Sequence, residues 1–185
     1  MTPKITETDI SGCYLIEGFI FSDIRGDFRE LFRLEWLEPK TGPLDFIQEN
    51  ISHSKKGVFR GFHFQKEFPQ AKYVSVISGK ILDFIIDLRV NSPTYKKLYS
   101  VEICAEESVS IFIPKGCAHG FLSLTDNTGV HYKADEYYSK DDEAGIRYDD
   151  RGVSVDWDMM LKKYQLDEII LSEKDILYPD FLWIK

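Results

Sequence analysis

The sequence predicts an all-β chain that folds as one jelly-roll barrel with short peripheral helices. Segments rich in β-branched and aromatic residues recur at short intervals, each bounded by Gly, Pro, Asn or Ser. Helical patterns are confined to residues 31–36 and to the tail after Trp157, and no repeat or linker interrupts the chain. Its 185 residues, of which 43% are apolar and 14% aromatic, suffice for one core, so we expect a single domain over residues 1–185.

The expected strands follow one another with turn residues between them. Ser78-Gly79-Lys80 is typical of a tight hairpin turn, Glu106-Glu107 of a second turn, and Asn91-Ser92-Pro93-Thr94 of a longer corner. About nine strands of this length indicate a jelly roll. We expect them at residues 14–21, 46–52, 58–64, 73–77, 81–88, 98–103, 108–113, 118–124 and 130–138.

Charge and cysteine content limit the partners and the compartment. A formal net charge of −8 argues against a nucleic-acid-binding surface, so an anionic ligand needs a locally positive pocket, for which Arg25, Arg60 and Lys72 are candidates. Three widely spaced cysteines argue against a disulfide framework or a zinc site, and predict ordinary buried thiols. No signal-peptide pattern or bilayer-spanning apolar stretch is present, so we expect a cytoplasmic protein without a membrane partner.

Two motifs carry the chemistry, Arg60-Gly-Phe-His63-Phe-Gln65 and Pro114-Lys-Gly116-Cys-Ala-His119-Gly-Phe121. In metal-binding barrels of the cupin type, the first motif holds two histidines one residue apart, which project into the same interior. Here the second position is Gln65, and two imidazoles with one amide are a poor ligand set for a transition metal. We therefore expect acid–base chemistry without a metal or other cofactor. A metal-dependent cupin remains an alternative, with Glu67 as the only further oxygen donor nearby.

These motifs belong to a longer series through which the chain resembles the dTDP-4-dehydrorhamnose 3,5-epimerase family over nearly its whole length. The number, order and spacing of the matches make the resemblance specific, although each alone is weak. The remaining matches are Asp23-Ile-Arg25-Gly26 with Glu30, Gln48-Glu49-Asn50, Ser52-His-Ser54-Lys55-Lys56-Gly57, Gln70-Ala-Lys72, Gly79, Asp87-Leu-Arg89, Ser92-Pro93-Thr94, Tyr132-Lys133, Tyr137-Tyr138 and Leu171-Ser172-Glu-Lys174-Asp175.

The resemblance implies a cupin-type fold and inversion of carbon 3, carbon 5 or both in a nucleotide-linked 4-keto sugar, either a deoxyhexose or a heptose. The carbonyl at carbon 4 acidifies the neighbouring hydrogens, but the enolate must still be stabilised as it forms. Imidazole suits the base, and the resemblance assigns His63 to that role with Asp175 behind it. It assigns Lys72 to the developing oxyanion and Tyr132 to proton return on the opposite face of the ring.

The same resemblance assigns a set of substrate-binding residues. A diphosphate needs cationic donors, for which guanidinium groups are well shaped, and an aromatic ring can stack on the nucleotide base. The set comprises Arg25, Glu30, Gln48, Asn50, Arg60, His119, Tyr138, Glu143 and Lys174. The resemblance also implies a homodimer in which each site borrows residues from its neighbour.

Structural interpretations of the same residues stay open at this point. His63 can be a core histidine bonded to backbone, and His119 can serve only to satisfy buried polar groups. Ser172-Glu-Lys-Asp175 is also typical of a capping box that opens a short helix. Residues alone do not choose between Tyr132, Tyr137 and Tyr138 as the acid. Strand alternation gives Tyr138 the parity of Tyr132, and directs His131 to the other face unless a bulge intervenes.

Several choices of reaction and substrate also stay open. Single and double epimerases share the same proton carriers, and a guanosine or cytidine sugar requires only altered contacts around Tyr138 and Glu143. Departures from the common family pattern lie near the pocket, at Phe62, Tyr73, Cys117, Glu49 and His131, but none removes a catalytic group. A ketoisomerase that shares the enolate step is the alternative reaction. A non-catalytic sugar-nucleotide binding module is the alternative class.

Overall fold

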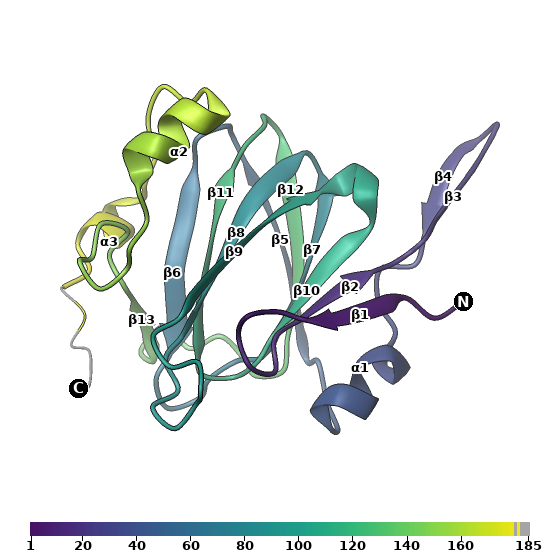
Figure 1. Cartoon of the computed structure of the whole chain (residues 1–185), viewed down its shortest axis with the longest axis horizontal. Helices are drawn as coiled ribbons and strands as arrows, with labels where there is room; N and C mark the ends of the chain where they lie inside the picture. The colour runs from purple at the N-terminus through teal and green to yellow at the C-terminus, as the bar shows by residue number, and fades with distance from the viewer. Residues whose placement is uncertain (180, 182–185) are drawn as a thin grey trace.

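Two antiparallel sheets pack face to face and form the jelly-roll barrel (Figure 1). The computed structural model describes residues 1–179 and 181. Hydrogen-bonded neighbours in the larger sheet follow the order β1 (Lys4–Glu7), β2 (Tyr14–Glu17), β10 (Val109–Ile113), β7 (Lys72–Ser78), β12 (Thr128–Ala134) and β5 (Gln48–Ser54). The smaller sheet has the order β13 (Glu143–Gly145), β6 (Phe59–Gln65), β11 (Cys117–Ser123), β8 (Lys80–Asp87) and β9 (Leu98–Cys104). The predicted all-β jelly roll is confirmed.

The remaining elements lie around the barrel. A hairpin of β3 (Ile20–Asp23) and β4 (Gly26–Arg29) projects away from it at the N-terminal side (Figure 1). The helix α1 (Leu34–Thr41) packs on the larger sheet, and α2 (Trp157–Tyr164) and α3 (Glu173–Ile176) lie beside the smaller one. A single 3₁₀ turn, Ala105–Glu107, connects β9 to β10. No helix in the described part of the chain is long and apolar enough to cross a membrane.

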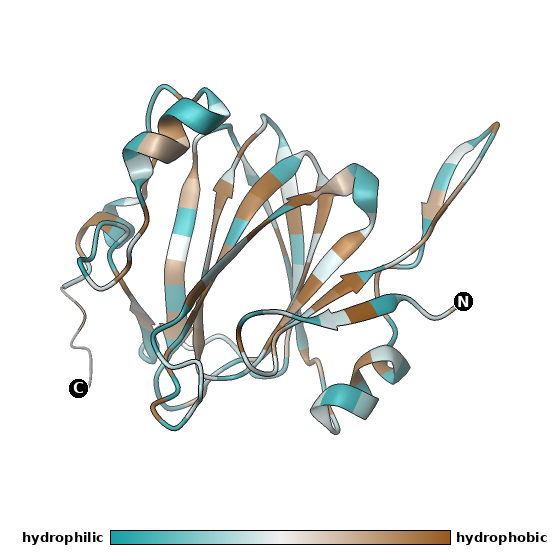
Figure 2. Ribbon diagram, viewed as in Figure 1, coloured by the Kyte–Doolittle hydropathy of each residue, from teal (hydrophilic) through white to brown (hydrophobic). Residues whose placement is uncertain are grey.

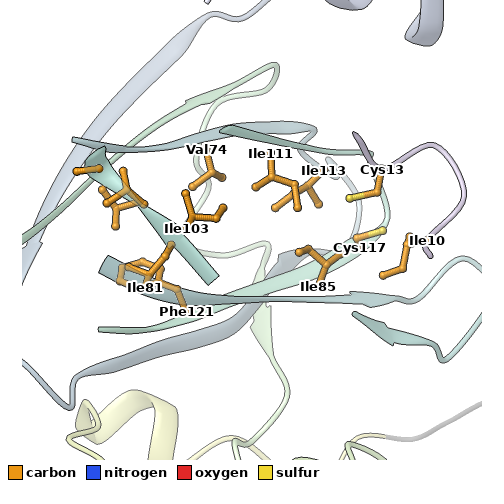
Figure 3. Close-up of a cluster of buried hydrophobic side chains, with 13 residues drawn as sticks. Ile10, Cys13, Val74, Ile81, Ile85, Ile103, Ile111, Ile113, Cys117 and Phe121 are labelled. Atoms are coloured by element: carbon orange, nitrogen blue, oxygen red, sulfur yellow. The ribbon is translucent and has the colours of Figure 1, made fainter. Parts of the chain in front are cut away.

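Apolar residues fill three layers. Figure 3 shows the middle layer, in which Val74, Ile111 and Ile113 from the larger sheet face Ile81, Ile85 and Phe121 from the smaller one. The outer face of the smaller sheet is covered by the C-terminal segment, and the outer face of the larger sheet by α1. Hydrophobic residues accordingly gather along the strands, whereas hydrophilic residues mark much of α1 and α2 (Figure 2).

Two of the three free cysteines, Cys13 and Cys117, are fully buried in the middle layer, where burial raises the pKa of each thiol to about 12. Cys104 is half-buried. The prediction of ordinary buried thiols is therefore confirmed at Cys13 and Cys117.

Long-range contacts shift some of the predicted elements. The strand expected at 14–21 is interrupted at Gly18, whose N–H donates to the Ser108 carbonyl (3.0 Å). The helix expected at 31–36 begins later, because Arg33 is still extended (φ −137°, ψ 135°) and the buried side chains are Trp36 and Leu37. The short strands β1, β4 and β13 carry too few residues for a visible alternation and were not predicted. The helix expected after Trp157 is confirmed as α2.

Candidate active site

One cavity of about 710 Å³ lies between the sheets and is bounded by the C-terminal segment. Its walls come from β5, β7 and β12 of the larger sheet, from β6, β11 and β13 of the smaller one, and from residues 170–175. All predicted site residues except Arg25 and Glu30 line it: His63, Lys72, Tyr132, Asp175, Gln48, Asn50, Arg60, His119, Tyr138, Glu143 and Lys174.

The glycine of the first motif explains how Arg60 and His63 both reach this cavity. Residues three apart on a regular strand face opposite sides. The pairing register of β6 with β11 shifts by one residue between Arg60 and His63. His63 therefore lies opposite His119, and Arg60 lies opposite Phe121. Gly61 permits this shift because its φ is +144° and a Cβ there would lie 2.4 Å from the Gly120 Cα.

His63 is paired with Asp175 across the cavity wall. The distance from His63 Nε2 to Asp175 Oδ1 is 2.6 Å, and Asp175 is only 3% exposed. Burial alone raises the pKa of Asp175, but the hydrogen bond and charge of His63 outweigh it, so the net pKa lies below the ordinary value. With Nε2 donating to this carboxylate, Nδ1 carries the imidazole lone pair.

The C-terminal segment that carries Asp175 is held to the start of β6 by backbone bonds. Ile170 N–H donates to the Gly57 carbonyl (2.8 Å), and Phe59 N–H donates to the Ile170 carbonyl (2.9 Å). Ser172 then caps α3, since its Oγ accepts from Asp175 N–H (3.2 Å). The Ser172 half of the predicted capping box is confirmed, whereas the Asp175 carboxylate is hydrogen-bonded to His63, where the cap places it.

A second histidine–carboxylate pair lies behind the first. His119 Nε2 is 2.7 Å from Asp83 Oδ1, and Asp83 is fully buried in β8. The other carboxylate oxygen of Asp83 has no hydrogen-bond partner among the described residues. Sequence reasoning missed Asp83, although a single acid inside the apolar run Ile81-Leu-Asp83-Phe-Ile-Ile86 is a visible signal.

Lys72 and Tyr132 face the two histidines from the other sheet. Lys72 begins β7 and Tyr132 lies in the middle of β12, whereas His63 and His119 belong to β6 and β11. Burial lowers the pKa of Lys72 to about 8, although the Asp83 and Glu143 carboxylates oppose the shift. Burial also raises the pKa of Tyr132, which keeps its hydroxyl protonated at neutral pH.

Polar contacts connect Tyr138, Glu143 and Lys174, which form the side of the cavity that we call the outer wall. The Glu143 carboxylate accepts from Tyr138 Oη (3.1 Å) and from Lys174 Nζ (2.7 Å). Tyr138 lies beyond β12, which ends at Ala134, so the prediction that it shares the strand parity of Tyr132 is wrong. Its position is set instead by its backbone N–H, which donates to Gln48 Oε1 (2.8 Å).

Arg60 and His131 also have partners of their own. Arg60 Nε donates to Ser54 Oγ (3.0 Å). His131 contacts Glu49 (3.1 Å) and does not line the cavity, as strand alternation predicts.

Gln65, at the position of the second cupin histidine, is engaged with the backbone. Its amide nitrogen donates to the Phe68 carbonyl (2.7 Å) and the Tyr137 carbonyl (3.2 Å), and its oxygen accepts from Ser139 N–H (2.8 Å). Within the described residues, no group of three or more His, Cys, Asp or Glu side chains is arranged to hold a metal. The Gln65 amide is bonded to backbone groups and does not point a free donor atom at the two histidines. The residues present therefore do not fit a cupin metal site.

Arg25 and Glu30 lie away from the cavity. Arg25 is in the turn between β3 and β4, the hairpin that projects from the barrel in Figure 1. Its side chain is 85% exposed and paired with Asp23. Glu30 follows β4 and is paired with Arg33. Within a single chain, neither Arg25 nor Glu30 lies at the cavity that the other predicted site residues line.

Comparison with known proteins assigns the family. The family model described as dTDP-4-dehydrorhamnose 3,5-epimerase matches residues 7–182. The chain belongs to the dTDP-4-dehydrorhamnose 3,5-epimerase family. A curated member of this epimerase family, from Methanothermobacter thermautotrophicus, is 40% identical over 93% of the chain and 91% of its own length.

Two solved structures show the same likeness. The 3,5-epimerase from Bacillus anthracis, with TDP and PPi bound, has a TM-score of 0.87 at 37% identity, covering 96% of this chain and 99% of the other. A 3'-monoepimerase from Streptomyces bikiniensis, in complex with dTDP-quinovose, has a TM-score of 0.81 at 31% identity, covering 97% and 86%. Single and double epimerases therefore both share this fold.

Proposed function

We propose that this epimerase acts on a dTDP-linked 4-keto-6-deoxyhexose and inverts its carbon 3, carbon 5 or both through an enolate. One observation carries the proposal: His63 and Tyr132 enter a single cavity from opposite sheets, with Lys72 in the same cavity. Inversion requires that a proton leave one face of the sugar ring and return to the other, so two opposed proton carriers match the reaction.

The proton transfers follow from the environments of these residues. His63 takes the proton from the carbon next to the carbonyl, and the electron pair of that C–H bond moves into the enolate, leaving negative charge on the oxygen of carbon 4. Asp175 supports the imidazolium that forms. The Lys72 ammonium stabilises the enolate oxygen. Tyr132 then gives its hydroxyl proton to the opposite face of the carbon. Before the next turnover the His63 imidazolium releases its proton to solvent and the Tyr132 phenolate takes one up.

Charge stabilisation by Lys72 and the two histidine–carboxylate pairs takes the place that a metal holds in metal-dependent cupins. Gln65 supports this reading, because its amide holds three backbone groups of the 68 and 137–139 loops and is not free to act as a ligand. His119, held by Asp83, orients the sugar or shares hydrogen bonds near the enolate.

The nucleotide and its diphosphate bind at the outer wall. Arg60 and Lys174 supply cationic donors for the phosphates, the Tyr138 ring stacks on the base, and Glu143, Gln48 and Asn50 make the polar contacts. Thymidine is proposed because the family and the relatives described above are named for dTDP sugars. The free cysteines fit the reducing conditions of the cytoplasm, where we place the enzyme.

A homodimer completes the site in this proposal. Arg25 and Glu30 lie on and beside a hairpin that projects from its own barrel, and its apolar side chains are exposed, among them Phe28 at 68%. A hairpin of this kind is stabilised by packing on a second copy, which would bring Arg25 to the diphosphate of the partner site.

Proton NMR in deuterated water tests the reaction. The protein is incubated with dTDP-, GDP- and CDP-linked 4-keto sugars, and the hydrogens on carbons 3 and 5 are followed, with His63→Ala as the control. Exchange at both carbons indicates a double epimerase, and exchange at carbon 3 alone a single epimerase. A carbonyl that moves to a neighbouring carbon indicates a ketoisomerase. Absence of exchange with every sugar contradicts the catalytic proposal and leaves a binding module.

Tyr132→Phe separates the two proton carriers in the same experiment. The variant keeps His63 and therefore still exchanges the substrate hydrogen, but it forms inverted product at least about a hundredfold more slowly because the opposite-face acid is missing. Loss of exchange and inversion to the same extent would contradict the assignment of Tyr132 as the acid alone.

A further inference from the structure

Tyr178 lies directly beside His63, although neither the motifs nor the cavity lining includes it. It follows α3 in the C-terminal segment. Its ring centroid is 6.0 Å from that of His63, with an angle of 63° between the ring planes, which is an edge-to-face arrangement. The imidazole therefore has Asp175 as its hydrogen-bond partner and the Tyr178 ring as a packing partner.

The space for this ring is created by a glycine. Gly145 in β13 lies opposite His63 in the pairing of β13 with β6. A Cβ at Gly145 would lie 2.1 Å from Tyr178 Cε2 and 2.4 Å from Cζ, so the tyrosine ring occupies the volume of a side chain there. The φ of Gly145 is outside the left-handed region, which means that its backbone would accept alanine. The position needs glycine because of Tyr178.

Contacts on both sides hold the segment that carries Tyr178. Before it, Asp175 is bonded to His63. After it, Phe181 packs on Phe64 with ring centroids 5.8 Å apart, and its N–H donates to Asp150 Oδ2 (2.9 Å). The ring of Tyr178 is thereby pressed between β13 and the imidazole.

The hydroxyl of Tyr178 contributes little to this arrangement. It is buried and makes no hydrogen bond of ordinary geometry among the described residues, although the Lys174 ammonium lies close enough to favour the ionised form slightly. Burial raises the pKa of Tyr178 to about 12, so the ring stays neutral at working pH. Tyr178 does not line the cavity, and His63 is the cavity residue that its ring contacts.

We propose that Tyr178 is a positioning residue for His63: its ring fills the space above Gly145, keeps the imidazole directed at Asp175 and excludes water from the pair. The inference rests on the proposed role of His63 as the base. An imidazole that loses this packing can rotate away from the productive geometry, and small misplacements of a catalytic group are costly in rate.

Steady-state kinetics of four variants tests the proposal. Tyr178→Phe keeps the ring and should retain kcat within about twofold of wild type, whereas Tyr178→Ala should lower kcat about tenfold or more with KM changed less than about threefold. Gly145→Ala should lower kcat similarly, because its methyl group displaces the ring. In the double variant Gly145→Ala/Tyr178→Ala the methyl group has room, so kcat should be no lower than in Tyr178→Ala. Losses that multiply in the double variant would overturn the proposal.

An NMR readout that needs no turnover keeps the inference separate from the proposed function. The chain has four histidines, and the signal absent from His63→Ala identifies the hydrogen-bonded N–H proton of His63. This proton should exchange slowly with water in wild type and Tyr178→Phe and rapidly in Tyr178→Ala and Gly145→Ala. Slow exchange in all four proteins overturns the proposal. If the wild-type protein shows no turnover with any sugar, the proposed function is contradicted. The exchange measurement still decides the role of Tyr178 in that case, because it needs no turnover.

Discussion

At the scale of single residues, the cavity contains ionisable groups whose burial disfavours their charged forms, and specific partners compensate some of them. Asp175 and Asp83 are almost inaccessible to water, and each accepts a hydrogen bond from a histidine. Lys72 has no such compensation, because the carboxylates that act on it do not offset its burial. A lysine desolvated in this way costs stability and is retained where a fixed positive charge serves a reaction.

Replacement of Lys72 by methionine should therefore raise stability and abolish most activity. The folded-state pKa of about 8 lies below the ordinary 10.5, so the unfolded chain binds the proton more tightly and the penalty is fully present below pH 8. It is relieved as pH rises from 8 to 10.5. Calorimetry should show Lys72→Met more stable than wild type by about 1 to 3 kcal/mol at pH 7, with the difference shrinking towards pH 10. A variant less stable than wild type at pH 7 would contradict this account.

At the scale of secondary-structure elements, short segments position the chemistry. The register shift in β6 turns Arg60 and His63 to one side, and α3, only one turn long, presents Asp175. A helix this short has little intrinsic stability, so its cap and its contacts with β6 decide whether it forms.

Removal of the Ser172 cap of α3 should lower activity, whereas removal of the equivalent Asp156 cap of α2 should not. Ser172→Ala removes the side-chain acceptor of Asp175 N–H, and Asp156→Ala removes the side-chain acceptor of Met159 N–H at α2. Each should cost about 1 kcal/mol in urea unfolding. Only Ser172→Ala should speed hydrogen exchange at Asp175 and lower kcat. Equal kcat losses in both variants would show that general destabilisation, not the placement of Asp175, is responsible.

At the scale of the whole molecule, the barrel presents a complete cavity but keeps two predicted binding residues outside it. Arg25 and Glu30 belong to a hairpin region that packs little against its own barrel (Figure 1). The apolar residues Phe21, Ile24 and Phe28 are exposed on it. The homodimer proposed above would account for both features, since a second copy would bury these side chains and bring the charged residues to a site.

Phe28→Asp should convert a dimer into a monomer and lower kcat/KM at least about tenfold, because a desolvated carboxylate opposes apolar packing. Met159→Asp is the matched control, since Met159 is also an exposed apolar residue but lies on α2, away from the hairpin. Light scattering gives the mass of each protein. The dimer proposal is wrong if wild type is a monomer, or if Phe28→Asp remains a dimer with full activity.

The sequence alone determined the class of fold, most strands, the two motifs and the family, because these depend on local patterns and on residues a few positions apart. Long-range contacts decided the remainder. Gln65 is bonded to loops more than 70 residues later, Asp83 meets His119 from another strand, and Tyr178 reaches His63 from the end of the chain. No local pattern specifies such partners. The tertiary structure decides which side chains share a cavity and which pKa values are shifted by burial, because both depend on the sheets closing on each other and excluding water.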